Sequence, residues 1–165
     1  MDELRLLITG NSGSGKTWLG ERLSERLAVP LVRLDDVYWE DAYGGKERDK
    51  RVVFDEVAGR ATQSSWVMEG VYGWLLPAAL PRATEFIFLD LPVDECLDNV
   101  RRRGNQGSGD EAFAALLAWA AEYPKRDNAN SRLAHQRLWD GFAGARRILR
   151  NRAEIERYLE LQATA

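Results

Sequence analysis

The residues best suited to chemistry lie near the start of the chain, where a lysine and a threonine follow three closely spaced glycines. Residues 10–17 read Gly-Asn-Ser-Gly-Ser-Gly-Lys-Thr, which fits the phosphate-binding loop pattern of Gly, four residues, then Gly-Lys-Ser/Thr. Lys16 would bridge the outer phosphates of a nucleotide, and the Thr17 hydroxyl would be one ligand of a magnesium ion carried with it. The predicted nucleotide site comprises Gly10, Asn11, Ser12, Gly13, Ser14, Gly15, Lys16, Thr17 and Trp18.

The segments on either side of this loop have the patterns that it requires. Residues 4–9 are mostly apolar and predict a buried strand, while residues 18–27 carry apolar side chains at helical spacing. Glycines let the backbone curl so that successive N–H groups point at phosphate oxygens, and the following helix adds its positive N-terminal end. The alternative is a chance glycine-rich turn, which the coincidence of strand, turn and helix start disfavours.

Carboxylates follow two further predicted strands. Residues 31–34 predict a strand that ends at Asp35 and Asp36, and residues 66–68 predict one that ends at Glu69. Ligands bind at the carboxyl ends of parallel strands, so these side chains are expected beside the phosphate loop. One carboxylate of the Asp35-Asp36 pair could accept or orient the proton of an attacking hydroxyl, and Asp36 is our candidate. Glu69 is our candidate to hold magnesium through water, although which of the three carboxylates acts on the acceptor and which on magnesium is left open. The alternatives are an aspartate that caps the next turn and a Glu69 that is a solvated strand end.

Residues 37–51 mix aromatic and charged side chains without a clear period, so we expect a mobile loop. Within it, Tyr38, Trp39 and Tyr43 could stack on a flat acceptor, or they could pin the loop onto the core. Both interpretations remain open at this point.

Residues 104–124 predict a helical flap whose first six residues contain three glycines. Ser108 and Glu111 have the spacing of a capping box, which places the helix start there. Cations lie at both ends of the flap, in residues 101–103 and at Arg126. They could contact phosphates, although those at 101–103 would also favour a helix dipole. A flap that closes over the phosphates would exclude water, which a transferase needs to protect its donor from hydrolysis.

The remaining segments complete an alternation of strands and helices. Residues 85–92 give the strongest predicted strand, and residues 147–150 give a short fifth one. Asp90, near the end of the strongest strand, is expected to be structural, with a contact to magnesium or to the phosphate loop as alternatives. Helices are predicted over residues 51–62, 94–103, 132–142 and 151–161, with a short one at 74–80. Five strands alternating with helices predict a three-layer α/β/α fold with a parallel sheet. The lone histidine, His135, is assigned no chemistry.

Composition narrows the class of protein further. The 165 residues, 45% hydrophobic and 30% charged, fit a single domain with its own core. The net charge of −3 gives no general attraction to nucleic acid. The single Cys96 cannot form an internal disulfide, residues 1–5 lack the features of a signal peptide, and no run reaches membrane-spanning length. We therefore expect a cytoplasmic protein with no membrane partner; its oligomeric state is not predicted.

Together these motifs resemble the small P-loop kinases over nearly the whole chain. The resemblance rests on residues 10–17, on the Asp35-Asp36 pair, on Glu-Gly-Val-Tyr at 69–72, on residues 88–92 and on Arg-Asp-Asn at 126–128. The chain is similar to the adenylate, shikimate and gluconate kinases, and looks closest to adenylate-kinase-like proteins labelled topology-modulation (FlaR-related). This resemblance implies five parallel strands in the order 2-3-1-4-5, a lid at about 104–124, and transfer of the γ-phosphoryl group of ATP, with Mg²⁺, to a small-molecule acceptor.

The resemblance also implies roles for individual residues. Arg103 and Arg126 would be lid arginines on the transferring phosphate, so the expected catalytic set is Lys16, Asp36, Arg103 and Arg126. Glu69 matches the acidic residue that steadies magnesium.

Two departures from the family pattern concern the acceptor and the lid. Adenylate kinases continue the acid-glycine pair into Pro-Arg, whereas this chain has Val71-Tyr72-Gly73, which argues against AMP as the acceptor. Asn99 stands where relatives often have an arginine. A nucleoside, a nucleotide or a small hydroxylated metabolite remains as the acceptor. The alternative function is a nucleotide-binding regulatory or DNA-topology-related protein without kinase turnover.

Overall fold

The core of the protein is a five-stranded parallel sheet. The computed structural model describes residues 3–41 and 45–162. The strands, in spatial order, are β2 (Leu31–Arg33), β5 (Trp66–Glu69), β1 (Arg5–Gly10), β6 (Glu85–Leu89) and β7 (Ala145–Leu149). Counted in chain order within this sheet, the order is 2-3-1-4-5, which confirms the predicted topology; the labels differ because two further strands, β3 and β4, form a separate sheet.

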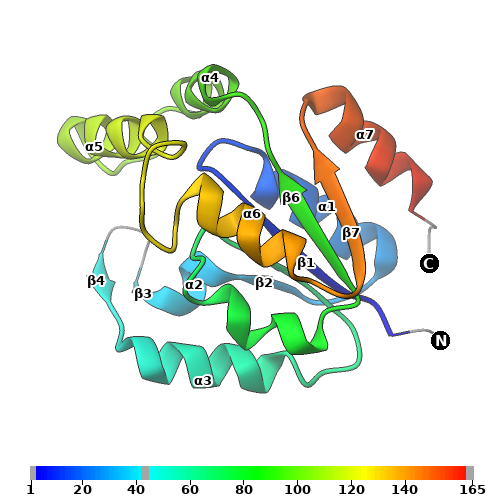
Figure 1. Ribbon diagram of the computed structural model, residues 1–165. Coiled ribbons are helices and arrows are strands. Elements are labelled where there is room, and N and C mark those ends of the chain that lie inside the picture. The colour runs from blue at the N-terminus through cyan, green and yellow to red at the C-terminus, as the bar shows by residue number, and fades with distance from the viewer. Residues whose placement is uncertain (1–2, 42–44, 163–165) are drawn as a thin grey trace.

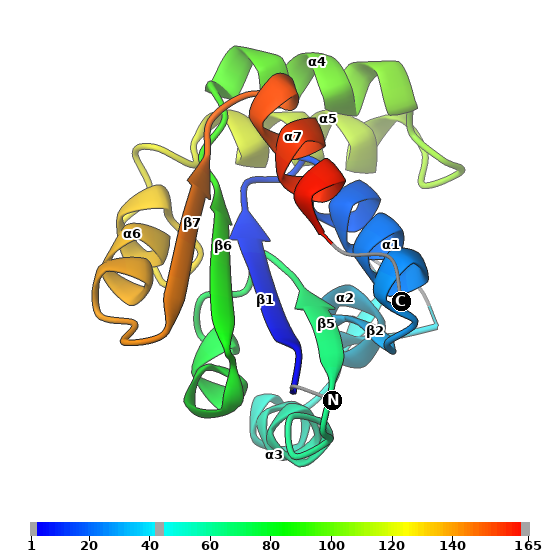
Figure 2. The same ribbon diagram turned by 90° about the vertical axis from the view of Figure 1, so that its right-hand side faces the viewer.

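Helices cover both faces of this sheet, so the predicted three layers are confirmed (Figures 1 and 2). Side chains alternate across β1: Leu6 and Ile8 pack with α1 (Lys16–Leu27) and α7 (Arg152–Leu161), while Leu7 faces the opposite side. That opposite side is covered by α3 (Lys50–Arg60) and α6 (Arg132–Asp140). Buried strands with apolar residues on both faces are what a helix-covered parallel sheet requires.

Two helices lie across the carboxyl end of the sheet rather than on its faces (Figures 1 and 2). They are α4 (Val93–Arg103) and α5 (Asp110–Ala121), which pack against each other. α5 falls within the predicted flap, and the segment before it contains glycines at 104, 107 and 109, all with positive φ. Among the described residues, none of the helices is both long enough and apolar enough to pass through a membrane.

Where residues 37–51 were expected to form a loop, the described ones, 37–41 and 45–51, lie partly in short regular elements. A short helix, α2 (Leu34–Tyr38), is followed by an antiparallel pair, β3 (Trp39–Glu40) and β4 (Lys46–Glu47). Tyr43 lies outside the described residues. The predicted helix at 74–80 is two 3-10 turns, η1 (Leu76–Ala78) and η2 (Leu80–Arg82), each with a proline that lacks the N–H a longer helix would use.

Candidate active site

The loop between β1 and α1 has a shape that only glycine can supply at key positions. Gly13 has φ +78°, and a Cβ atom there would lie 2.2 Å from the carbonyl oxygen of Cys96 in α4. A Cβ at Gly10 would lie 2.6 Å from the carbonyl oxygen of Leu89, at the end of β6. The loop is therefore packed directly against neighbouring backbone, so the glycines of the sequence pattern have a steric reason.

Two asparagine side chains hold this loop in place. Asn99 Nδ2, on α4, donates a hydrogen bond of 2.9 Å to the carbonyl oxygen of Gly13. Asn11 Nδ2 donates one of 2.9 Å to the carbonyl oxygen of Ala120, in the last turn of α5. Sequence analysis noted Asn99 only as a departure from relatives, and it gave Asn11 no individual role. The loop is thus bonded to both helices that lie above it.

Lys16 is the cation at the centre of the site. Its Nζ donates a hydrogen bond of 2.7 Å to the carbonyl oxygen of Asn11, so the ammonium group lies back over the loop. Burial lowers the pKa of Lys16, while the negative charges of Glu69 and Asp35 oppose that change. The sheet edge therefore brings the lysine together with two of the predicted carboxylates.

The two residues predicted to bind a metal, Thr17 and Glu69, lie side by side. The Thr17 hydroxyl donates a hydrogen bond of 2.9 Å to Glu69 Oε1, and the glutamate is only 3% exposed. Burial raises the pKa of Glu69, with the Lys16 charge acting in the opposite direction. A hydroxyl beside a carboxylate is a hard-oxygen donor set, and Mg²⁺ is commonly held by one or two such groups together with substrate phosphates. The residues present therefore fit a magnesium ion bound with a nucleotide.

Of the two adjacent aspartates, Asp35 is the one that lies beside the site. Its carboxylate accepts a hydrogen bond from the Tyr72 hydroxyl, which in turn accepts one of 2.8 Å from Trp39 Nε1. Asp36 is exposed on α2, where the structure gives its side chain no hydrogen bond or ion pair within the described residues. Asp35 and Asp36, of which Asp36 was the candidate, were both expected at the end of a strand. They lie instead on a helical turn, where consecutive side chains point about 100° apart.

The two predicted lid arginines lie at opposite ends of the lid region. Arg103 ends α4 and is exposed, and its charge contributes to the lowered pKa of Lys16. The guanidinium carbon of Arg126 lies 3.7 Å from the ring centroid of Trp119 and 5.4 Å from that of Tyr123. These cation–π contacts hold the Arg126 guanidinium beside the end of α5, and they were not predicted from the sequence.

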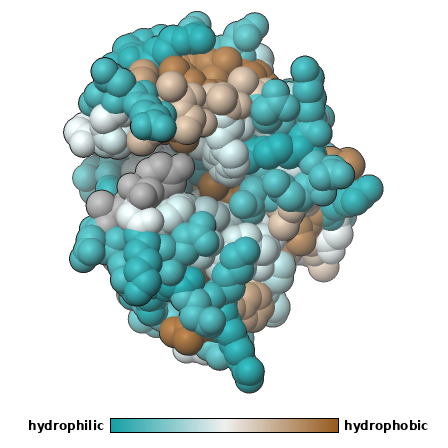
Figure 3. All heavy atoms as spheres, turned by 90° about the vertical axis from the view of Figure 1, so that its left-hand side faces the viewer, coloured by the Kyte–Doolittle hydropathy of each residue, from teal (hydrophilic) through white to brown (hydrophobic). Residues whose placement is uncertain are grey.

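The lid helix starts differently from its prediction. Gly109 is its N-cap and supplies no side-chain hydrogen bond, while the Ser108 hydroxyl donates to the Asn105 carbonyl oxygen at 2.7 Å. The predicted capping box of Ser108 and Glu111 is therefore wrong. Figure 3 shows an apolar band where Figure 1 places α5, with the surface hollowed beneath it. Helix α5 therefore carries an apolar band on this face of the molecule.

Two polar residues behind the site have structural roles. Asp90 accepts two hydrogen bonds of 2.7 Å from the guanidinium of Arg132, which agrees with the structural role expected for Asp90. His135 is completely buried, with Nδ1 2.7 Å from the Tyr123 hydroxyl and Nε2 2.8 Å from the Val71 carbonyl oxygen. Burial lowers the pKa of His135 to about 3, so it is a neutral imidazole. Only its type, a histidine on an apolar helix face, could have drawn attention to it in the sequence.

Tyr38 lies at the centre of an aromatic cluster that also contains Trp39, Tyr72 and Trp74. The centroid of its ring lies 5.0 Å from that of Trp39, 5.1 Å from that of Tyr72 and 5.2 Å from that of Trp74. Tyr38 is buried, whereas Trp39 and Trp74 are half-buried. Of the two interpretations left open, Tyr38 therefore pins this segment to the core, and Trp39 lies at the edge of the cluster.

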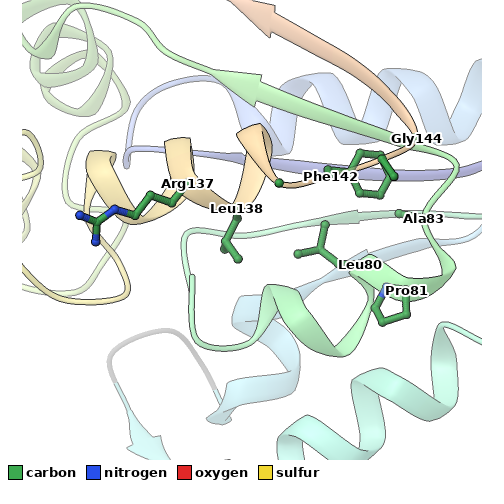
Figure 4. Close-up of a pocket in the computed structure, with 9 residues that line it drawn as sticks. Leu80, Pro81, Ala83, Arg137, Leu138, Phe142 and Gly144 are labelled. Carbon is green, nitrogen blue, oxygen red and sulfur yellow. The ribbon is translucent and has the colours of Figure 1, made fainter.

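A cavity of about 510 Å³ lies elsewhere in the molecule (Figure 4). Its lining includes Leu80, Leu138 and Phe142, close to the residues that lead into β6 and β7. In a parallel sheet this is the amino edge, opposite the phosphate loop. The cavity is therefore not part of the site described above.

The fold and the loop together define a P-loop nucleotide-binding protein with a kinase-like architecture. A family model described as an AAA domain matches residues 6–115, and the chain belongs to this family. The chain is also similar to a Bacillus subtilis (strain 168) protein named "Uncharacterized protein YqaC", with 29% identity over 144 residues covering 79% of this chain and 77% of that protein.

Solved structures with this fold include several kinases. Shikimate kinase from Bacteroides thetaiotaomicron superposes with a TM-score of 0.56 at 18% identity, covering 95% of this chain and 94% of that one. Shikimate kinase from Acinetobacter baumannii, solved in complex with shikimate, gives 0.59 at 17% identity, with coverages of 96% and 90%. A gluconokinase from Sinorhizobium meliloti 1021 gives 0.53 at 15% identity, with coverages of 96% and 95%. The narrower resemblance to topology-modulation proteins stays a prediction.

Proposed function

We propose that this protein transfers the γ-phosphoryl group of ATP to a hydroxyl group of a small-molecule acceptor. The observation that carries the proposal is the convergence of Lys16, Thr17, Glu69 and Asp35 at one edge of the sheet, around a glycine loop shaped for phosphate. The kinase-like fold supports it, and the neighbour solved with shikimate supports a small hydroxylated metabolite as one acceptor class. We place the reaction in the cytoplasm and in a single domain, as the sequence predicts.

On the donor side, the loop backbone and Lys16 would bind the phosphates of ATP. Lys16 leaves the Asn11 carbonyl when a phosphate oxygen takes its place, because a charged acceptor forms the stronger hydrogen bond. Thr17 and Glu69 would hold Mg²⁺, which neutralises charge on the outer phosphates when it is bound. Catalysis in this class of reaction is mostly positioning and charge stabilisation, so these contacts carry most of the effect.

On the acceptor side, we assign the reacting hydroxyl to Asp35 rather than to Asp36. Asp35 lies within the electrostatic reach of Lys16 and Glu69, and Tyr72 holds its carboxylate by a hydrogen bond. A general base must lie within hydrogen-bonding distance of the proton it accepts, which favours the carboxylate nearer the phosphates. Arg126 would stabilise charge on the transferring group as the 104–124 lid closes, and Arg103 would assist from the end of α4.

The test is turnover of ATP to ADP, with magnesium, across nucleosides, nucleotides, sugar acids and polyols. Lys16→Ala should lower acceptor-stimulated turnover by about 10²-fold or more, the usual cost of losing one group that stabilises transition-state charge. Lys46→Ala is the matched control, because Lys46 is an exposed lysine on β4 whose ammonium group pairs with Glu40 at the surface. Undiminished turnover in Lys16→Ala would refute the assignment. Tight ATP binding without stimulated turnover would favour the regulatory alternative.

A further inference from the structure

The end of the lid helix is bonded to the donor side of the site. We call residues 119–126, the last turn of α5 and the turn that follows, the lid root. The Asn11 side chain reaches it from the phosphate loop, through the 2.9 Å hydrogen bond to the Ala120 carbonyl oxygen. Asn11 is 1% exposed and Ala120 is fully buried, so water cannot readily replace this bond.

The lid root is bonded to the acceptor side by a second, separate route through His135. A backbone carbonyl can only accept, so Nε2 of the neutral histidine carries the proton and donates to Val71. Nδ1 must then accept from the Tyr123 hydroxyl, which lies 2.7 Å away. The chain of hydrogen bonds therefore runs from Tyr123 in the lid root, through His135, to Val71. All three residues are buried.

Val71 belongs to a turn that holds the acceptor-side residues. Residues 71–73, here the acceptor turn, include Tyr72, whose hydroxyl donates to Asp35. The same turn is fastened at Gly73, whose N–H donates a 2.9 Å hydrogen bond to Asn130 Oδ1. A Cβ on Gly73 would lie 1.7 Å from the Ala129 carbonyl oxygen, so the backbones are in direct contact. The segment after the lid is thus packed onto the acceptor turn.

The lid root in turn carries Arg126. Its guanidinium stacks on Trp119 at 3.7 Å and approaches the ring of Tyr123 at 5.4 Å. A shift of the Tyr123 ring would therefore move the surface on which Arg126 rests. Both routes end on the same short segment, one from the phosphate loop and one from the acceptor turn.

We propose that His135 is a positioning residue that couples the acceptor turn to Arg126 through Tyr123, while Asn11 separately couples the phosphate loop to the same lid root. This inference rests on the proposed function, because it assigns the two routes to the acceptor and to ATP. Loss of one route affects the corresponding substrate and leaves the other largely unchanged. A general loss of packing would affect both substrates together.

The kinetic test compares three variants with a matched control. Tyr123→Phe removes the hydroxyl and keeps the ring beneath Arg126; it should raise the acceptor KM about fivefold to tenfold, as expected for one buried hydrogen bond, with the KM for ATP within twofold. Asn11→Ala should instead raise the KM for ATP and leave the acceptor KM within twofold. His135→Gln, which keeps a side-chain N–H donor for Val71, should retain more acceptor affinity than Tyr123→Phe. The control is Tyr158→Phe, which removes a buried tyrosine hydroxyl on α7 and should alter neither KM.

Hydrogen–deuterium exchange tests the same inference without requiring turnover. Tyr123→Phe should speed amide exchange in both 71–76 and 119–126, whereas Asn11→Ala should speed it at 10–17 and 117–121 and spare 71–76. Equal changes of both KM values in Tyr123→Phe, or unchanged exchange at 71–76, would overturn the coupling. If no acceptor supports turnover, the proposed function fails, and the exchange pattern still decides whether the two routes exist.

Discussion

The strongest prediction for solution behaviour concerns acidification, because the buried His135 must stay neutral in the folded protein. Its imidazole donates to the Val71 carbonyl and accepts from the Tyr123 hydroxyl, so a second proton on the ring would remove the acceptor at Nδ1 and force the Tyr123 hydroxyl hydrogen to turn away. The pKa of His135 is about 3 in the folded protein, against 6.5 for an ordinary histidine. Because the folded pKa is lowered, this contribution to stability is complete above pH 6.5 and is lost as the pH falls from 6.5 towards 3.

The size of the loss follows from the same two pKa values. Each pH unit inside that window lowers the free energy of unfolding by about 1.4 kcal/mol, because the unfolded chain takes up one proton that the folded chain does not. Because pH 5 is about 1.5 units below the pKa of the unfolded histidine, the free energy of unfolding should fall by about 2 kcal/mol between pH 8 and pH 5. That loss is a large part of the stability of an ordinary domain.

The assay is urea unfolding at pH 8 and at pH 5 for the wild type and for His135→Gln. Burial raises the pKa values of Glu69 and Glu85, which stabilises the folded form as the pH falls, but these groups are present in both proteins. The difference between the two proteins in their change of free energy therefore isolates His135. An equal loss in the two proteins would refute the conclusion that the fold holds this histidine neutral.

Two further predictions concern the phosphate loop. Gly13→Ala should abolish nucleotide binding, measured by tryptophan fluorescence, because residue 13 has a positive φ and its added Cβ atom would lie 2.2 Å from the carbonyl oxygen of Cys96. Gly59→Ala is the control, because its added Cβ atom on α3 has no heavy atom within 4 Å. This variant should bind nucleotide normally and be about 0.5–1 kcal/mol more stable. Thr17→Ser should keep the Mg²⁺ dependence of nucleotide binding, whereas Thr17→Val, which lacks the hydroxyl beside Glu69, should need several-fold more Mg²⁺. Normal binding by Gly13→Ala, or equal Mg²⁺ dependence of the two Thr17 variants, would contradict these roles.

The donor side of the site was predictable because its information is local. The glycines, Lys16 and Thr17 lie within eight consecutive residues, and the apolar runs on either side indicate one strand and one helix. Glu69 was also placed correctly beside Thr17, since strand ends of a parallel sheet meet at one edge. The spacing rules alone were therefore sufficient to bring a hydroxyl and a carboxylate together across 52 positions of sequence.

Two identical capping-box spacings show where local rules stop. Asn151 and Glu154 have this spacing at the start of α7, and there Asn151 Oδ1 accepts a hydrogen bond of 2.9 Å from the Glu154 N–H. Ser108 and Glu111 have the same spacing, yet Gly109 is the N-cap. Ser108 lies between Gly107 and Gly109, both of which have positive φ, so the chain enters the helix by a path that takes the hydroxyl to the Asn105 carbonyl instead. Flanking backbone geometry outweighs a favourable side chain here.

The acceptor side could not be predicted in the same way because long-range contacts define it. Asp35 is distinguished from Asp36 by a hydrogen bond to Tyr72, 37 positions away, and by a helical turn too short to show a period. His135 is hydrogen-bonded to Val71, 64 positions away, and the residues around either one in the sequence do not predict that contact. Patterns of neighbouring residues cannot identify pairs that are so far apart in the sequence. Asp35 and His135 could therefore be noted as polar residues, but their partners could not be predicted.

This division has a physical consequence for how the site can vary. The phosphate loop depends on two backbone positions, Gly10 and Gly13, where a Cβ atom would collide with the carbonyl oxygens of Leu89 and Cys96. The acceptor turn depends on side-chain hydrogen bonds, which other polar pairs of similar size can replace. If the proposed function holds, Tyr72, His135 and their partners are the residues whose substitution should alter the acceptor without disturbing the phosphate loop. Under the proposed function, substitutions at Asp35 and in the acceptor turn should therefore change the acceptor preference, whereas substitutions at Gly10 or Gly13 should abolish nucleotide binding.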